Sequence, residues 1–189
     1  MRIDIITENA ITEFQKDLMT TEYISLDIET SGLNEFTDYI KLIQVGMSNN
    51  VYIIYPLILN DKYVKYMLEL INESKKTIIG HNLEFDLRFI RRRYGILLTT
   101  VADTMLTEIL INNGLKTGKS RYSLKELVFK YFGIELDKTV RDKFIGDTAI
   151  TEEMIGYAYN DVLYLEQMYK TQKDIIIKQG QEKILVLEN

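Results

Sequence analysis

Two acidic residues, Asp27 and Glu29, stand two positions apart in an otherwise apolar stretch. The stretch 23–29 alternates in polarity, which predicts a β-strand, and residues two apart on a strand share a face. Two carboxylates held side by side repel each other unless a cation lies between them, so the pair is a candidate metal site. The alternative is an amphipathic strand whose apolar residues lie in the core while both acids face water.

A tyrosine and an aspartate recur at helical spacing later in the chain, at Tyr157 and Asp161. Positions i and i+4 lie on one helix face, so both side chains would reach one pocket, although a surface Tyr–Asp pair has the same spacing. A further aspartate, Asp86, falls in the first turns of a helix that we expect Asn82 to cap. An acid there also complements the helix dipole. Taken singly, none of these pieces identifies a catalytic site.

The polarity pattern predicts strands first, and then strands and helices in alternation. The expected strands are 1–6, 23–29, 39–47, 51–55, 77–79 and 99–102, with a turn at Asn49-Asn50. The expected helices are 8–19, 64–71, 82–94, one from Asp103, 123–132 closed by Gly133, one opened by Thr151, and a long helix over 160–178. This order predicts an α/β fold with a mixed β-sheet. The length of 189 residues, without a linker, favours a single domain over 1–189.

The composition restricts the chemistry that the chain can perform. Without cysteine and with one histidine, His81, the chain cannot form thiolate zinc sites, imidazole-built metal sites or Ser-His-Asp triads. Oxygen ligands remain, which favours Mg²⁺ or Mn²⁺. The net charge of −5 argues against passive coating of nucleic acid, but not against an enzyme whose metal ions neutralise phosphates. We expect no membrane span and no signal peptide, and therefore a cytoplasmic protein.

The order of the three acidic pieces is more specific than any one of them. Asp-x-Glu on a strand is followed by His-Asn-x-x-x-Asp and then by Tyr-x-x-x-Asp on helices. This arrangement resembles the motifs of the DEDDy class of DnaQ-like 3′→5′ exonucleases, which includes the proofreading domains of family A DNA polymerases and ribonuclease D. The resemblance covers roughly 23–169 and extends to the segments 27–33, 103–106, 123–127 and 157–162.

The resemblance implies a ribonuclease H-like mixed β-sheet flanked by α-helices, and hydrolysis of phosphodiester bonds with two divalent cations, Mg²⁺ or Mn²⁺. Asp27, Glu29 and Asp161 would hold one cation. Asp27, with Asp86 acting through water, would hold the second, and the two metals would clamp the attacking and leaving oxygens. Tyr157 would orient the attacking water, since an ordinary tyrosine pKa of about 10 favours positioning over general-base catalysis.

The same resemblance indicates residues that bind the substrate. Thr30 belongs to the first motif, and Leu33 would wedge against the terminal base or else pack within its loop. Asn82 would contact the substrate strand, although helix capping explains it equally well. Neighbouring polar residues are expected to be structural, capping or solvated. For the basic ones among them, contact with phosphates is the alternative. These residues are His81, Asp103, Lys138, Arg141 and the arginine run 91–93.

No residue of the sequence distinguishes DNA from RNA. The lack of tryptophan, and so of the Ser-Asp-Trp stretch typical of ribonuclease D, favours single-stranded DNA, with a polymerase as a possible partner. The lack of a further helical domain after Lys178 points the same way. A ribonuclease D-like exoribonuclease is the alternative, and a non-catalytic nucleic-acid-binding or interaction module is a third interpretation, less favoured because all four acids and Tyr157 are present.

Two further segments are open to interpretation. The loop 114–120 resembles a P-loop, but it has three residues between its glycines instead of four, so we reject nucleotide hydrolysis there. The apolar C-terminal stretch 175–187 is expected to be a last helix that packs on its own domain. Its alternative is a surface that docks on a partner.

Overall fold

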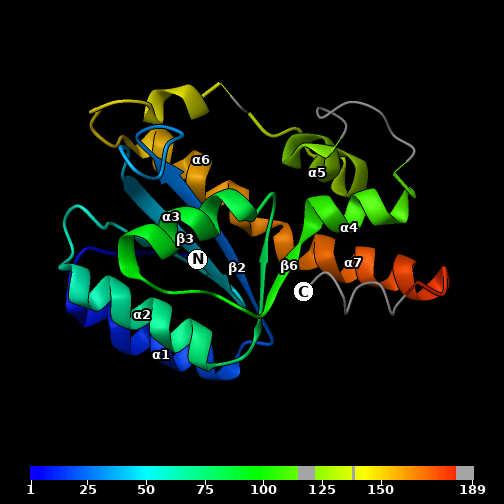
Figure 1. Ribbon diagram of the computed structural model, residues 1–189, viewed down its shortest axis with the longest axis horizontal. Helices are drawn as coiled ribbons and strands as arrows, with labels where there is room; N and C mark the ends of the chain where they lie inside the picture. Colours follow the sequence, from blue (N-terminus) through cyan, green and yellow to red (C-terminus); the bar gives the residue numbers. More distant parts are fainter. Residues whose placement is uncertain (115–121, 138, 182–189) are drawn as a thin grey trace.

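The computed structural model describes residues 1–114, 122–137 and 139–181, and within them a six-stranded sheet forms the centre (Figure 1). The strands are β1 Arg2–Ile5, β2 Tyr23–Thr30, β3 Ile40–Met47, β4 Asn50–Ile54, β5 Thr77–Gly80 and β6 Val101–Asp103. They lie in the order β1-β4-β3-β2-β5-β6. β3 pairs antiparallel with β2 and β4, whereas β1–β4, β2–β5 and β5–β6 are parallel. The predicted mixed sheet is therefore confirmed.

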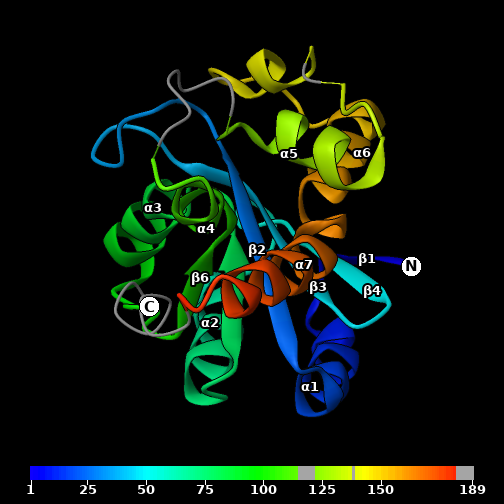
Figure 2. The ribbon, with the colours of Figure 1, turned by 90° about the vertical axis from the view of Figure 1, so that its right-hand side faces the viewer.

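Helices cover both faces of this sheet. They are α1 Ile11–Thr20, α2 Asp61–Glu73, α3 Glu84–Tyr94, α4 Thr104–Ile111, α5 Leu124–Phe132, α6 Glu152–Leu163 and α7 Leu165–Lys178, with 3₁₀ turns η1 Glu8–Ala10 and η3 Arg141–Phe144. The apolar side chains of α1, α2 and α3 form one core, and those of α5, α6 and α7 form the other. Figures 1 and 2 show α1 and α2 side by side, away from α5 and α7. None of the described helices is long and apolar enough to cross a membrane.

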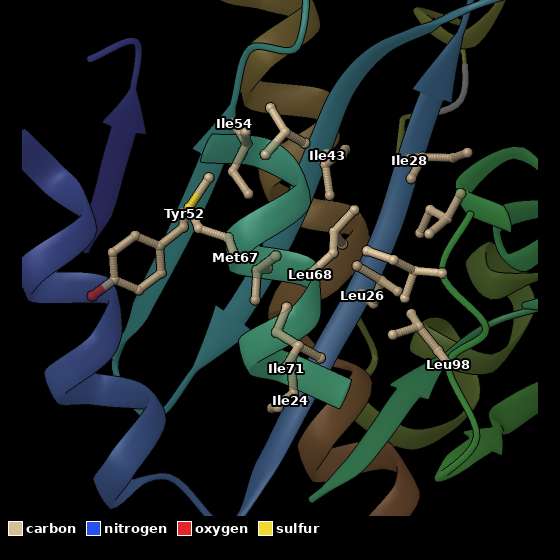
Figure 3. Close-up of a cluster of buried hydrophobic side chains, with 14 of the residues drawn as sticks. Ile24, Leu26, Ile28, Ile43, Tyr52, Ile54, Met67, Leu68, Ile71 and Leu98 are labelled. Atoms are coloured by element: carbon tan, nitrogen blue, oxygen red, sulfur yellow. The ribbon is translucent and has the colours of Figure 1, made fainter. Parts of the chain in front are cut away.

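The central strand β2 has different chemistry on its two faces. Ile24, Leu26 and Ile28 point into the apolar core beneath α2, as Figure 3 shows. The alternate residues Asp27 and Glu29 therefore point to the opposite face, which α6 covers. The three apolar residues lie in the core, as expected for an amphipathic strand. The acidic face is covered by a helix, whereas that interpretation expected it to face water.

The predicted continuous helix over 160–178 is wrong, because the chain changes direction at Tyr164. α6 ends at Leu163, Tyr164 has φ −100° and ψ −8°, and α7 begins at Leu165. α6 packs on β2, β3 and β4, whereas α7 packs on β2, β5 and α4. A straight helix would not cover both regions, and neither glycine nor proline marks the break in the sequence.

The expected helix cap at Asn82 is also wrong. Asn82 adopts a left-handed backbone with φ +58°, and α3 begins only at Glu84, with no side-chain capping hydrogen bond at its start. The backbone N–H groups of Asn82 and Leu83 instead donate to the carboxylate of Asp103. Asp103 also caps α4, as expected, by accepting from the first N–H groups of that helix.

The hairpin between β3 and β4 turns one residue earlier than expected. Met47 pairs with Asn50, so the turn consists of Ser48 and Asn49. Ser48 has a φ of +52°, the left-handed conformation that tight two-residue hairpins require.

Candidate active site

Three carboxylates from two elements meet on the α6 face of the sheet. Asp27 and Glu29 extend from β2 and Asp161 extends from α6, with one oxygen of each lying within 4.8 Å of the others. Glu29 and Asp161 are only 8% and 6% exposed, so water screens the repulsion between them weakly. A divalent cation would neutralise this repulsion, and an all-oxygen donor set suits Mg²⁺ or Mn²⁺. The three residues therefore fit a metal site.

Asp86 lies beside this cluster and is not one of the three carboxylates that converge within it. β5 pairs with β2 only over Tyr23–Ser25, so the later part of β2 extends past the end of β5. There the N–H of Ile28 donates to Asp86 Oδ1 over 2.9 Å, which fixes the carboxyl group next to the backbone between the two acids of β2. Burial raises the pKa of Asp86, while the hydrogen bond from Ile28 acts in the opposite direction.

Tyr157 shares the inner face of α6 with Asp161, one helical turn away. Burial raises the pKa of Tyr157, and the negative charges of Asp161, Glu29 and Asp27 raise it further. The hydroxyl therefore remains a proton donor near neutral pH. A hollow of about 220 Å³ opens beside Tyr157 and Asp161, and it leaves room for a ligand at this end of the site.

The loop between β2 and β3 presents apolar side chains to solvent. Leu33 is 72% exposed, so the interpretation that it packs within its loop is wrong. Thr30 is buried, and its hydroxyl donates to the Gly32 carbonyl over 2.6 Å, which holds the loop. Phe36 is also 72% exposed, and the guanidinium of Arg92 lies 5.3 Å from its ring centre. Phe36 is not among the residues predicted from the sequence, although an aromatic residue in a largely polar loop is a signal that the sequence contains.

The same loop is tied to the segment that precedes α6. The connecting pairs are Gly146 N–H to the Ser31 carbonyl at 2.7 Å, the Tyr39 hydroxyl to Asp147 Oδ1 at 2.6 Å, and Lys41 Nζ to Thr148 Oγ1 at 2.9 Å. Because Lys41 is nearly inaccessible, burial lowers its pKa. These bonds hold the loop after the first motif and the lead into the third motif as one unit.

Other predicted residues lie around the site without joining the carboxylate cluster. Asn82 is exposed, with its backbone held by Asp103. His81 Nδ1 lies 3.0 Å from Thr104 Oγ1, which fits the structural role expected of it. Arg141 lies on η3, and its positive charge is one of the smaller influences on the pKa of Asp86.

Comparison with known proteins identifies the family. A family model described as 3'-5' exonuclease matches residues 3–176. The chain belongs to the DnaQ-like 3′→5′ exonucleases. It is 32% identical over 169 residues to DNA polymerase I of Aquifex aeolicus, an alignment that covers 89% of this chain and 27% of the polymerase. The predicted family, whose members hydrolyse phosphodiester bonds, is thus confirmed.

Solved structures share the fold of this chain. Ribonuclease D of Escherichia coli, an exoribonuclease involved in structured RNA processing, has a TM-score of 0.80 at 22% identity, covering 95% of this chain and 46% of that one. Brucella melitensis NrnC bound to pGG has a TM-score of 0.74 at 21% identity, covering 97% of this chain and 83% of that one. The expected ribonuclease H-like fold is confirmed by these likenesses.

Some predictions from the sequence lie outside the described residues. These are the interpretation of the P-loop-like segment after Gly114, the interpretation of Lys138, and the part of the C-terminal stretch at 182–187. Within the described part of that stretch, Ile176 is fully buried in the core that includes α6. The beginning of the stretch therefore packs on its own domain.

Proposed function

We propose that the chain acts as one domain, 1–189, that removes nucleotides from the 3′ end of a single strand. In this proposal Asp27, Glu29 and Asp161 hold one divalent cation, and Asp27 and Asp86 support a second. The covered cluster of three carboxylates is the observation that carries the proposal. When bound, such cations neutralise phosphate charge and lower the pKa of water. The chain itself supplies rigid positions for the acids, because β2 and α6 both belong to the packed core.

Tyr157 completes the proposed site as a donor that orients a water molecule beside the scissile phosphate. Its ring packs against Phe144, so the hydroxyl has a fixed place on the face of α6 that carries Asp161. The hollow next to both residues offers space for the substrate. These features support positioning of the water by a neutral tyrosine.

Single-stranded DNA is our proposed substrate, and a polymerase is the proposed partner. The 32% identity to a DNA polymerase supports this choice, since it exceeds the identities to ribonuclease D and NrnC. RNA is the second candidate, because ribonuclease D of E. coli, an exoribonuclease, shares the fold over 95% of this chain. A third candidate is a short fragment such as the pGG bound to NrnC, whose fold this chain shares over 97% of its own length.

A time course on 5′-labelled DNA and RNA of one sequence, with pGG as a third substrate, tests the proposal. Reactions contain Mg²⁺ or Mn²⁺, and the controls are EDTA and an Asp27→Ala/Glu29→Ala double variant. A ladder that shortens from the 3′ end, and that is lost in both controls, supports the exonuclease. If RNA or pGG is degraded faster than DNA, that molecule replaces DNA as the proposed substrate. If a folded protein shortens none of them, the non-catalytic module becomes the better interpretation.

The exposed pair Phe36 and Arg92 leads to a prediction about substrate length. Bases of a single strand stack on exposed aromatic rings, and each stack contributes about 1–3 kcal/mol. Phe36 lies on the loop that starts directly after β2, at the side of the carboxylates. We therefore expect Phe36→Ala to raise KM for a long single strand about tenfold while kcat stays unchanged.

Steady-state kinetics on a long oligonucleotide and on pGG measure this effect. KM for pGG should change less, because a two-nucleotide ligand offers fewer bases that can stack on Phe36 than a long strand does. Phe129→Ala is the matched control, since Phe129 is an exposed phenylalanine on α5, with 54% of its surface accessible. An unchanged KM for the long substrate in Phe36→Ala would exclude a stacking role for this ring.

A further inference from the structure

A glutamine in the middle of β3 has an unusual environment. Gln44 is 0% exposed, and neither its amide nitrogen nor its amide oxygen has a hydrogen-bond partner among the described residues. Burial of a polar group without a partner carries the full cost of removing that group from water, and native proteins seldom leave both ends of one amide unpaired. Such a residue calls for a partner that its neighbours in the described fold do not provide.

The sheet register places Gln44 directly beside the carboxylate cluster. Gln44 is the cross-strand partner of Asp27 in the antiparallel pair β2–β3. Opposite residues of such a pair lie on the same face of the sheet, with Cβ atoms roughly 4.5–5.5 Å apart. On its other side Gln44 pairs with Ile53, which has no polar side-chain atom to offer. Of its two cross-strand neighbours, only Asp27 can accept a hydrogen bond from the side-chain amide.

The helix above leaves Gln44 little freedom to turn elsewhere. α6 packs on β3, and at Gly46, two residues along the same face, a Cβ atom would lie 3.7 Å from the carbonyl oxygen of Val162. The amide of Gln44 is therefore enclosed between the sheet and α6.

The other fully buried glutamine of the described chain shows the contrast. Gln172 on α7 is also 0% exposed, but its Nε2 donates to the Thr104 carbonyl over 2.9 Å and to Glu108 Oε2 over 3.3 Å. A buried glutamine with a structural role thus uses its amide nitrogen in this fold. Gln44 has the same burial without that bond.

We propose that Gln44 is a positioning residue for the metal site, and that its Nε2 donates to the Asp27 carboxylate when Asp27 holds a cation. The inference rests on the proposed function of the carboxylates. A carboxylate that binds a metal generally has its remaining lone pairs occupied by hydrogen bonds, which fix its orientation. The loss of such an outer partner weakens metal binding by about 10–100-fold. Gln44 thereby selects the orientation in which Asp27 presents its oxygens to the ion.

The test is a titration of the whole chain with Mn²⁺ in the absence of substrate. Binding is measured by calorimetry and by the change in melting temperature. Gln44→Met has a similar length and no hydrogen-bonding amide, and Gln44→Leu serves as a second variant if the first does not fold. We expect either variant to melt at the same or a higher temperature than the wild type in EDTA, because no native bond is lost. The Mn²⁺ concentration for half-saturation should rise about tenfold or more.

A matched control separates this role from a purely structural one. Gln172→Met removes a buried amide that is bonded elsewhere, so it should melt at a lower temperature and keep the wild-type half-saturation concentration. If Gln44→Met binds Mn²⁺ within a factor of about two of the wild type, the inference fails while the metal site stands. If the wild-type chain itself binds no Mn²⁺, the proposed metal site fails and the inference falls with it.

Discussion

Replacing Asp161 with asparagine is expected to lower the turnover of a 3′-end substrate by about 10⁴-fold, because metal ions contribute several kcal/mol of transition-state stabilisation. Asparagine keeps the shape of the side chain but removes one of the three charges that converge within 4.8 Å. The remaining two acids hold a divalent cation less tightly and with a less defined geometry. Single-turnover kinetics with excess enzyme measure the loss without interference from product release.

Stability measurements distinguish this effect from misfolding. In EDTA, Asp161→Asn should melt at or above the wild-type temperature, since one buried negative charge is gone and the repulsion among the acids decreases. With Mn²⁺ the wild type should gain stability, because an ion that binds only the folded state stabilises it, and the variant should gain much less. Asp174→Asn, at an exposed position on α7, is the control with no expected change in either assay. Full activity in Asp161→Asn would remove this residue from the site.

The sequence predicted the elements of the site better than their three-dimensional relations. Alternation along 23–29 was sufficient to place Asp27 and Glu29 on one face, and that prediction depends only on strand geometry. The position of Asp86 beside Ile28 depends on β5 ending earlier than β2, which is a relation between strands far apart in the chain. Local patterns contain no information about such differences in strand length.

Two errors have a common physical origin, because tertiary packing overrode a local signal. Asn82 is a good capping residue by type, but Asp103 binds the backbone of its segment from another strand end and the cap becomes unnecessary. The helical pattern continues without interruption through Tyr164, yet α6 and α7 must cover different strands. In both cases the deciding contact comes from residues distant in the sequence.

Gln44 illustrates a limit of pattern reading within a correctly predicted strand. A single glutamine among apolar residues of β3 looks like a tolerated polar substitution. Only the register with Asp27 and the closure by α6 show that its amide is enclosed beside three acids. The choice between DNA and RNA is a similar case, since it depends on groups of a bound strand that no residue type in the motifs encodes.

Removing only the hydroxyl of Tyr157 should cost less than removing a carboxylate. Phenylalanine preserves the ring, which packs against Phe144 with ring centres 6.1 Å apart, so the fold should be unaffected. The hydroxyl stays protonated, because burial and the neighbouring acids raise its pKa. It therefore contributes direction to a water molecule instead of accepting its proton. We expect Tyr157→Phe to lower kcat about 10²-fold, the scale of one positioned donor.

The comparison with Asp161→Ala decides between the possible roles of this tyrosine. With kcat measured at saturating Mn²⁺, equal losses in the two variants would contradict positioning and make Tyr157 as essential as a metal ligand. Tyr159→Phe, two residues along α6, is the control for general effects of losing a hydroxyl from this helix. If additional Mn²⁺ restores full activity to Tyr157→Phe, the hydroxyl acts only by orienting Asp161. A loss that persists at every Mn²⁺ concentration places its effect on the water and the substrate, because the metal site is then already filled.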